Sequence, residues 1–551
     1  MVPPGIGRGW GGPRSVVVTS GASAGNGLTV SSGSTLLISS GSTQGSITVS
    51  SGGTKEFGSG VTALGSIVAN TTMQLDSGAV GSVLTVNSGS TLRLMNGAVL
   101  SGAAPTFNSA GNLQIGSGNT LTLTTGQTSG GAFNFQIGNG GAVVVSSGAT
   151  LSGPNVLSGG TLTLMGGATV AGTTTLSAGA TEQVGSGFTL SGLTVSSGVQ
   201  LRVLSSGITS DTTVNSGGTL TLLGGASLAG ATTLSAGATE VLSSGFTLNN
   251  ATVASGVTLR VSTGAVVSGA TVSNGGALIM SGGTLSGATT VSSGGEISGA
   301  SVASGATLTL MGGAVVVGTP TIATGGTEQI GSGYLLNVSS GQTATGIVVL
   351  SGGSEVVYSG GVESGTVISG GGAETVSSGG RASSTVVSSG GSETILNGGI
   401  LVGATIMSGG SEIVSSGGTV SGATLSGGTL EITSGGTAAG TTITFGAAGG
   451  TLILDDSQNF TSGVGVIGGF GVPGNLDLAD ISYSSSNTLG FVEAGGNTSG
   501  TLTVSDGTHT AVLTLLGQYV AGNFTMQSDG HGGTLITDPP VDQQSLLTQP
   551  H

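Results

Sequence analysis

The stretch SGGSEVVYSGGVESGTVISGGGAETVSSGG, residues 351–380, repeats its own pattern after 19 residues. Glutamates mark this period at Glu355, Glu374, Glu393, Glu412 and Glu431. One apolar column follows it at Ile368, Val387, Ile406 and Leu425, and a second at Val357, Val376, Ile395 and Val414. A period this strict indicates that residues 351–436 are copies of one structural unit.

Short β-branched segments such as ETVSS and TVVSS favour strands, and SGG or NGG triplets between them permit the positive φ values of tight corners. Two apolar columns and two glycine turns per period predict a coil of two strands. Such a unit cannot bury its own apolar side, whereas stacked copies bury a continuous stripe. We therefore predict an all-β chain, a parallel β-solenoid of about 22 coils between Ser15 and about Gly450.

Longer motifs recur upstream. Copies of one motif begin at Ser158, Ser216 and Ser304 (SGGTLTLMGGATV, SGGTLTLLGGASL, SGATLTLMGGAVV), and copies of a second begin at Thr181, Thr239 and Thr327 (TEQVGSG, TEVLSSG, TEQIGSG). Both motifs are offset by 58 and then 88 residues. The first offset is close to three coils of 19, and the second is about four and a half. Either the coil length changes there or an insertion lies between copies.

The glutamate column raises an electrostatic question. Like charges stacked ~4.8 Å apart repel by about 1 kcal/mol per pair in water, and by roughly four times more at a protein-like dielectric. The glutamates are therefore predicted to face solvent or to hold cations. One interpretation is a solvated column that keeps the solenoid soluble; another is a row of weak calcium sites at Glu355, Glu374, Glu393, Glu412 and Glu431. A recognition surface is the third.

Composition excludes several classes of function. Seven basic residues against 22 acidic ones give a net charge of −15, with no Lys or Arg after Arg381, so no nucleic-acid partner is expected. All three histidines lie beyond the repeats, and Arg93, Arg202, Arg260 and Arg381 are isolated along the chain. We therefore expect no catalytic residues, no cofactor apart from calcium, and no enzyme. No apolar run approaches the ~18 residues of a membrane helix.

The chain divides into four parts by composition. Residues 1–14 are predicted to be a flexible N-terminus without a signal peptide, and residues 15–450 are the solenoid. Residues 451–538 contain alternating segments around Asp-Gly turns, such as GTLTVSDGTHTAVLTLLG, and predict a small C-terminal β domain that caps the solenoid. Residues 539–551 are predicted to be a flexible tail.

The SGG repeats of residues 351–436, and more loosely those of residues 15–450, resemble the passenger repeats of AIDA-type autotransporter adhesins. The resemblance implies an extracellular or outer-membrane-associated β-solenoid that mediates adhesion, aggregation or biofilm formation. Its partners would be host or neighbouring cell surfaces, glycans or further copies of itself. The final block, from GFGVPGNLDLADISY to GGTLITD, resembles the C-terminal domains of large secreted bacterial repeat proteins, which implies contact with export machinery. The alternative function is a secreted carbohydrate-active β-helix, a polysaccharide lyase or hydrolase.

Overall fold

The computed structural model describes residues 15–538 except 19–21, 25–26, 45, 102–104, 109, 439 and 461–464. The predicted N-terminal and C-terminal flexible segments, residues 1–14 and 539–551, lie outside the described residues. Within the described ranges every regular element is a strand, apart from the short 3-10 helix η1 (Ala521–Asn523). The strands stack into a parallel β-solenoid of about 22 turns, which confirms the predicted fold class. No helix in this part of the chain is long and apolar enough to cross a membrane.

The chain is divided into two compact units. Unit 1 comprises residues 1–249, 253–267 and 275–284, and unit 2 comprises residues 250–252, 268–274 and 285–551. Each unit is built from ladders, by which we mean sets of parallel strands that are hydrogen-bonded from one coil to the next.

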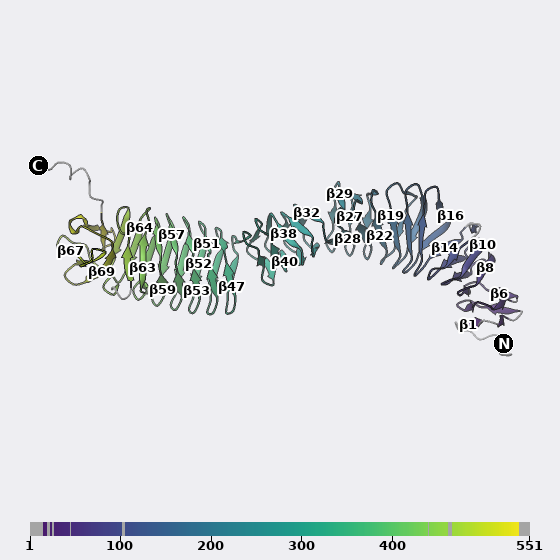
Figure 1. Ribbon diagram of the computed structural model, residues 1–551, viewed down its shortest axis with the longest axis horizontal. Coiled ribbons are helices and arrows are strands. Elements are labelled where there is room, and N and C mark those ends of the chain that lie inside the picture. The colour runs from purple at the N-terminus through teal and green to yellow at the C-terminus, as the bar shows by residue number, and fades with distance from the viewer. Residues whose placement is uncertain are drawn as a thin grey trace. The chain divides into compact units, whose positions relative to one another are not determined.

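From residue 335 on, the coils of unit 2 form three ladders, so one coil has three strands and the prediction of two is wrong (Figure 1). The strands of ladder a are β46 (Leu335–Val338), β49 (Ser354–Val357), β52 (Ala373–Val376), β55 (Ser392–Ile395), β58 (Ser411–Val414), β61 (Thr429–Ile432), β64 (Gly450–Leu454) and β66 (Gly474–Leu478). Those of ladder b are β47 (Thr343–Thr345), β50 (Val362–Ser364), β53 (Arg381–Ser383), β56 (Ile400–Val402), β59 (Thr419–Ser421) and β62 (Thr437–Ala438). Those of ladder c are β42 (Thr307–Leu310), β45 (Thr327–Ile330), β48 (Ile347–Val349), β51 (Val367–Ile368), β54 (Val386–Val387), β57 (Thr405–Met407), β60 (Thr424–Ser426), β63 (Thr441–Phe445) and β65 (Gly465–Gly468).

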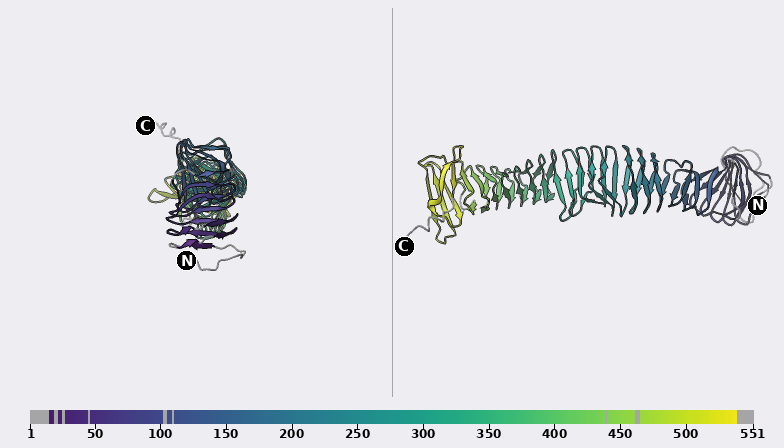
Figure 2. Two further views of the ribbon diagram at one scale, coloured as in Figure 1. Left: turned by 90° about the vertical axis from the view of Figure 1, so that its right-hand side faces the viewer. Right: turned by 90° about the horizontal axis from the view of Figure 1, so that it is seen from above.

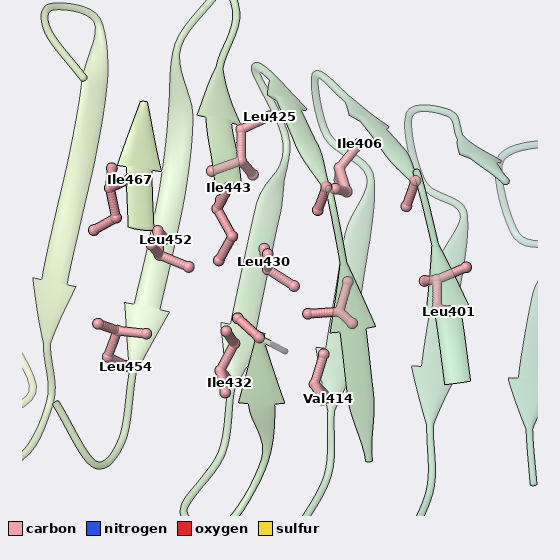
Figure 3. Close-up of a cluster of buried hydrophobic side chains, with 14 of the residues drawn as sticks. Leu401, Ile406, Val414, Leu425, Leu430, Ile432, Ile443, Leu452, Leu454 and Ile467 are labelled. Atoms are coloured by element: carbon pink, nitrogen blue, oxygen red, sulfur yellow. The ribbon is translucent and has the colours of Figure 1, made fainter. Parts of the chain in front are cut away.

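The core of unit 2 lies between these ladders. Successive side chains of a strand point to opposite faces, so alternate residues turn inward. The two predicted apolar columns are buried, the Val357 column on ladder a and the Ile368 column on ladder c. Inward side chains of neighbouring coils pack against each other, as Leu430, Leu452, Ile443 and Ile467 do in Figure 3. The missed third strand is ladder b, whose inward residues are as varied as Glu363, Ala382, Leu401 and Val420.

The C-terminal region joins the same ladders. Parallel pairing continues past residue 451 to β65 and β66. The remaining strands are β67 (Thr488–Glu493), β68 (Ser499–Ser505), β69 (Thr510–Leu516), β70 (Thr525–Ser528) and β71 (Thr534–Thr537). They pair antiparallel, except that β69 pairs parallel with β65. Ladder a ends at β66 against β71, and ladder c continues from β65 into the β69–β68–β67 sheet (Figure 2, yellow end).

Unit 1 carries two long ladders. The first contains β1 (Ser15–Val18), β4 (Thr35–Ile38), β7 (Thr54–Phe57), β9 (Thr72–Leu75), β11 (Thr91–Leu94), β14 (Asn112–Ile115), β16 (Thr128–Ile137) and β18 (Thr150–Val156). The second contains β15 (Thr120–Leu123), β17 (Ala142–Val145), β19 (Thr161–Leu164), β22 (Thr181–Val184), β25 (Gln200–Val203), β28 (Thr219–Leu222), β31 (Thr239–Leu242), β34 (Thr258–Ser262) and β37 (Ala277–Ser281).

The unequal motif offsets follow from these ladders. The copies at Thr161 and Thr219 lie in one ladder of unit 1, three coils apart through steps to Thr181 and Gln200. The copy at Thr307 lies in β42, in ladder c of unit 2. The offset of 58 is therefore a whole number of coils in one ladder, and the offset of 88 joins strands of different units.

Candidate functional site

Four of the five predicted glutamates point into the core, which corrects the expectation that they face solvent. Glu355, Glu374, Glu393 and Glu412 are at most 1% exposed. They stack directly on one another as partners in β49, β52, β55 and β58. Each lies two residues before an inward valine or isoleucine of the same strand, as Glu355 lies before Val357. The alternation of a strand therefore forces both side chains to the same face.

Glu431 does not belong to this buried column. The coil from Ser411 to Thr429 is one residue shorter, so Glu412 pairs with Leu430 and Glu431 pairs with the outward Ile413. Glu431 is therefore half-buried on the outer face. The 19-residue count continued correctly along the sequence, but the shortened coil changes the face on which the fifth glutamate lies.

The four buried carboxyl groups have few partners. Both carboxyl oxygens of Glu374, Glu393 and Glu412 lack a hydrogen bond within the described structure. Glu355 accepts one hydrogen bond from the Thr366 hydroxyl at 3.2 Å through Oε2, while its Oε1 has none. Nearby, Glu363 of β50 is also buried but accepts hydrogen bonds from the backbone N–H groups of Thr366 at 2.6 Å and Ser383 at 3.2 Å.

The buried carboxyl groups of the column avoid mutual repulsion by staying protonated. Burial, followed by the neighbouring Glu363 carboxylate, raises the pKa of Glu355 to about 8. Burial alone raises the pKa of Glu412 to about 8. Burial and then the adjacent carboxylates raise the pKa values of Glu374 and Glu393 well above the usual range. A neutral carboxylic acid avoids both the desolvation cost and the like-charge repulsion that led to the solvent-facing prediction.

Calcium binding at the column stays a prediction. Ca²⁺ takes six to eight oxygen ligands, and each coil brings one carboxyl group to the column. Nowhere in the described ranges do three or more His, Asp or Glu side chains gather closely enough to hold a metal ion. One coil therefore brings fewer carboxyl oxygens to the column than a Ca²⁺ ion takes.

A second feature, not predicted from the sequence, is a set of breaks in the solenoid. At a break, one ladder continues from a coil to the next, while the other strands of the first coil do not pair with those of the second. The clearest in unit 1 follows β19, where β22 continues the ladder. There β20 (Thr169–Ala171) and β21 (Thr175–Leu176) pair only backward with β18, and β23 (Thr189–Ser191) and β24 (Thr194–Val195) pair only forward. A second break in unit 1 separates β29 (Ser227–Ala229) from β32 (Thr247–Asn249).

The third break lies in unit 2, where β42, β45 and β48 form the continuous ladder. One wall consists of β43 (Val315–Val317) and β44 (Thr321–Ile322), which pair with β40 (Glu296–Ser298) and β41 (Ser301–Val302). The other wall consists of β46 and β47, which pair with β49 and β50. No ladder in the described structure joins the two walls.

A cavity of about 780 Å³ opens at the third break. Inward side chains that closed coils bury, such as Ile322 and Leu336, are only half-buried here and line the cavity. Glu328 of β45 also lines it and is 8% exposed. Burial raises the pKa of Glu328 to about 7, and no hydrogen bond or cation of the described residues offsets this shift.

The same glutamate recurs at the two breaks of unit 1 that follow β19 and β29. Glu182 and Glu240 occupy the second position of TEQV and TEVL, as Glu328 does in TEQI. Both are buried and turned inward, and burial raises the pKa of each to about 7. Another break of unit 1 lies at β14, where β12 (Val99–Leu100) and β13 (Thr106–Phe107) pair only backward and β15 pairs only forward. There the segment is NLQI, with the buried Leu113 in place of the glutamate. The repeated TE motifs therefore mark three of the breaks, although periodicity alone does not show which ladders stop.

Several other polar side chains serve structural roles. Asp506 accepts hydrogen bonds from the backbone N–H groups of Thr508 and His509, each at 2.7 Å, and closes the turn between β68 and β69. Asp529 likewise accepts from His531 at 2.7 Å in the turn between β70 and β71. Arg93 donates to the side-chain oxygens of Gln114 and Gln74. Within the described ranges, the four solenoid arginines form no ion pair with a carboxylate.

Comparison with known proteins adds a structural likeness. No protein-family model and no curated protein matches the chain. A solved fragment described as TibC-catalyzed hyper-glycosylated TibA55-350 is similar to it, with 23% sequence identity and a TM-score of 0.18. The likeness covers 73% of this chain and 99% of that fragment. At this identity and TM-score, the likeness assigns no function to this chain.

Proposed function

We propose that the chain is a secreted or surface-displayed bacterial adhesin that acts in aggregation or biofilm formation through its β-solenoid. The observation that carries the proposal is the outer face of the ladders. Outward positions carry polar residues from coil to coil, as in one ladder of unit 1 with Thr161 and Thr163, then Thr181 and Gln183, Gln200 and Arg202, and Thr219 and Thr221. Such a face offers many equivalent hydrogen-bonding positions, so weak contacts with glycans, cell surfaces or another copy add up through multivalency.

The location of the protein tests this proposal first. The full chain and a variant lacking residues 452–551 are tagged and expressed in the native host, and supernatant, protease-treated intact cells and cytosol are assayed. We expect the full chain outside the cytosol, and display of the full chain should increase cell aggregation over an empty display control. Full-length protein confined to the cytosol would contradict the proposal.

The alternative carbohydrate-active enzyme makes a different prediction. Hydrolysis or lysis of a polysaccharide depends on one or two acidic residues, so a single substitution would abolish it. Under the adhesin proposal, replacing carboxylates one at a time changes adhesion or stability by degrees. A scan of the buried glutamates, assayed against acidic and neutral polysaccharides, separates the two functions.

A further inference from the structure

We propose that the cavity at the third break binds an extended peptide segment that places a lysine or arginine side chain against Glu328. The proposal does not depend on where the protein is displayed, because it concerns the purified chain alone.

The walls of the cavity supply the backbone part of this site. Strands β43 and β44 are paired on one edge with β40 and β41, and β46 and β47 are paired on one edge with β49 and β50. The edges that face each other across the break carry no ladder partner in the described structure. Unpaired strand edges are templates for an added strand, since a peptide backbone presents N–H and C=O groups at the same spacing. A sugar ring does not reproduce that spacing.

The floor of the cavity supplies the charge preference. Glu328 reaches the cavity from the continuous ladder, and no cation of the described residues neutralises it. A cationic side chain entering the cavity would pair with the ionised carboxylate and lower its pKa, so binding would release a proton below about pH 7. The net charge of the chain, −15, further favours a basic partner over an acidic one.

The chain's own C-terminal tail does not supply this cation. No Lys or Arg follows Arg381, so residues 539–551 contain none. The proposed occupant is a basic segment of a separate chain.

The test uses the full purified chain and a defined probe, the peptide acetyl-Thr-Val-Thr-Lys-Thr-Val-Thr-amide. Hydrogen exchange is followed in residues 315–322 and 335–345, and affinity is measured by calorimetry. We expect the peptide to protect both segments and to bind more tightly at pH 8 than at pH 5.5. The same peptide with norleucine in place of lysine should bind on the order of tenfold more weakly.

Matched variants keep the proposal falsifiable. Glu328→Leu, which introduces the residue the chain already carries at Leu113, should weaken lysine-peptide binding on the order of tenfold or more. Glu431→Leu removes the same charge from the outer face and should leave binding unchanged. If Glu328→Leu lowers the folded fraction, Glu328→Gln removes the charge with nearly the same shape and gives the same comparison. Equal binding of the lysine and norleucine peptides, or protection by maltohexaose but not by the lysine peptide, would overturn the proposal.

Discussion

At the scale of single residues, the alternation of side chains along a strand decides whether each glutamate points into the core or outward. Glu393 lies two residues before Ile395 in β55, and both point inward because side chains two positions apart share a face. The period of 19 was readable from the sequence, and the buried Val357 column already implied the inward face. The prediction of solvent exposure was wrong because it took the carboxyl groups to be ionised. Burial at this position instead keeps them protonated.

Because the buried carboxyl groups have raised pKa values, we expect the free energy of unfolding to fall as pH rises. Folding raises the pKa of Glu355 and Glu412 from an ordinary 4.5 to about 8, so between these values the folded state binds more protons than the unfolded state. The stabilisation is fully present below about pH 4.5 and is lost as pH rises through about 8. Each carboxyl group contributes a slope of up to about 1.4 kcal/mol per pH unit. Urea denaturation at pH 5, 6, 7 and 8 measures this dependence of the free energy of unfolding on pH.

Substitution of the column tests the cause of that slope. Glu393→Gln replaces a titrating group by a neutral amide of similar shape, and it should make the pH dependence shallower and raise stability at pH 8. Glu431→Gln changes the half-buried carboxyl on the outer face and should alter the slope less. Stability that increases from pH 5 to pH 8 in the parent protein would contradict a protonated column.

Removal of calcium gives a separate test at the same residues. Because the column does not gather enough ligands for Ca²⁺, we expect EDTA to leave the melting temperature unchanged at pH 7. A lower melting temperature in EDTA that disappears in Glu393→Gln and Glu412→Gln would instead establish the calcium sites predicted from the sequence.

At the scale of elements, the backbones of adjacent coils approach closely at one corner of the third break. Gly312 donates its backbone N–H to Ser332 O at 2.9 Å, in the corner after β42. A Cβ atom at Gly312 would lie 2.5 Å from the carbonyl carbon of Gly333. The GGA triplets at Gly166, Gly224 and Gly312 thus let adjacent coils touch on one side while the walls separate. The sequence showed the triplets as turns, but their close approach to the next coil is a tertiary property.

Substitution of Gly312 is therefore expected to destabilise unit 2. Gly312→Ala should reduce the free energy of unfolding by about 1–3 kcal/mol, since the contact is with backbone atoms that cannot rotate away. Gly490→Ala is the control, because an added Cβ there meets nothing within 4 Å. Equal unfolding curves for the Gly312→Ala and Gly490→Ala variants would contradict the close approach.

Removal of one coil tests the three-strand unit. Deleting residues 373–391 removes one strand from each ladder and brings Ser392 to the position of Ala373, so a folded protein is expected. Deleting residues 373–382 removes about half a coil and places strands on the wrong ladders, so lower stability is expected. Circular dichroism and thermal melting compare the two, and equal stability of both deletions would argue against a fixed three-strand coil.

At the scale of the whole molecule, the periodicity of the sequence predicted the solenoid but not its breaks. Repeated apolar columns were enough for a parallel solenoid. The third strand went unseen because its inward column mixes Glu363 with alanine, leucine and valine. The boundary near residue 451 was inferred from a change in composition, yet β64 and β66 continue ladder a across it. Hydrogen bonding between backbones tolerates this change of side chains.

The C-terminal strands predict the behaviour of a truncated chain. Removing residues 479–551 would leave the outer edges of β65 and β66 without β69 and β71. Exposed flat edges pair with other chains, so we expect soluble oligomers or aggregates on size-exclusion chromatography where the full chain elutes as a smaller species. A truncated chain that elutes as a stable monomer would show that these edges are protected in another way.

The breaks also give the solenoid a mechanical property. At the third break, β42, β45 and β48 carry the only ladder that links successive coils within the described part of that region, whereas the coils after it share three. Tension applied across unit 2 would act on those few hydrogen bonds. The coils would therefore separate at the third break before the coils that share three ladders unfold. A chain anchored at one end and held at the other would thus extend in a small early step, absorbing a pull while most of its coils stay folded.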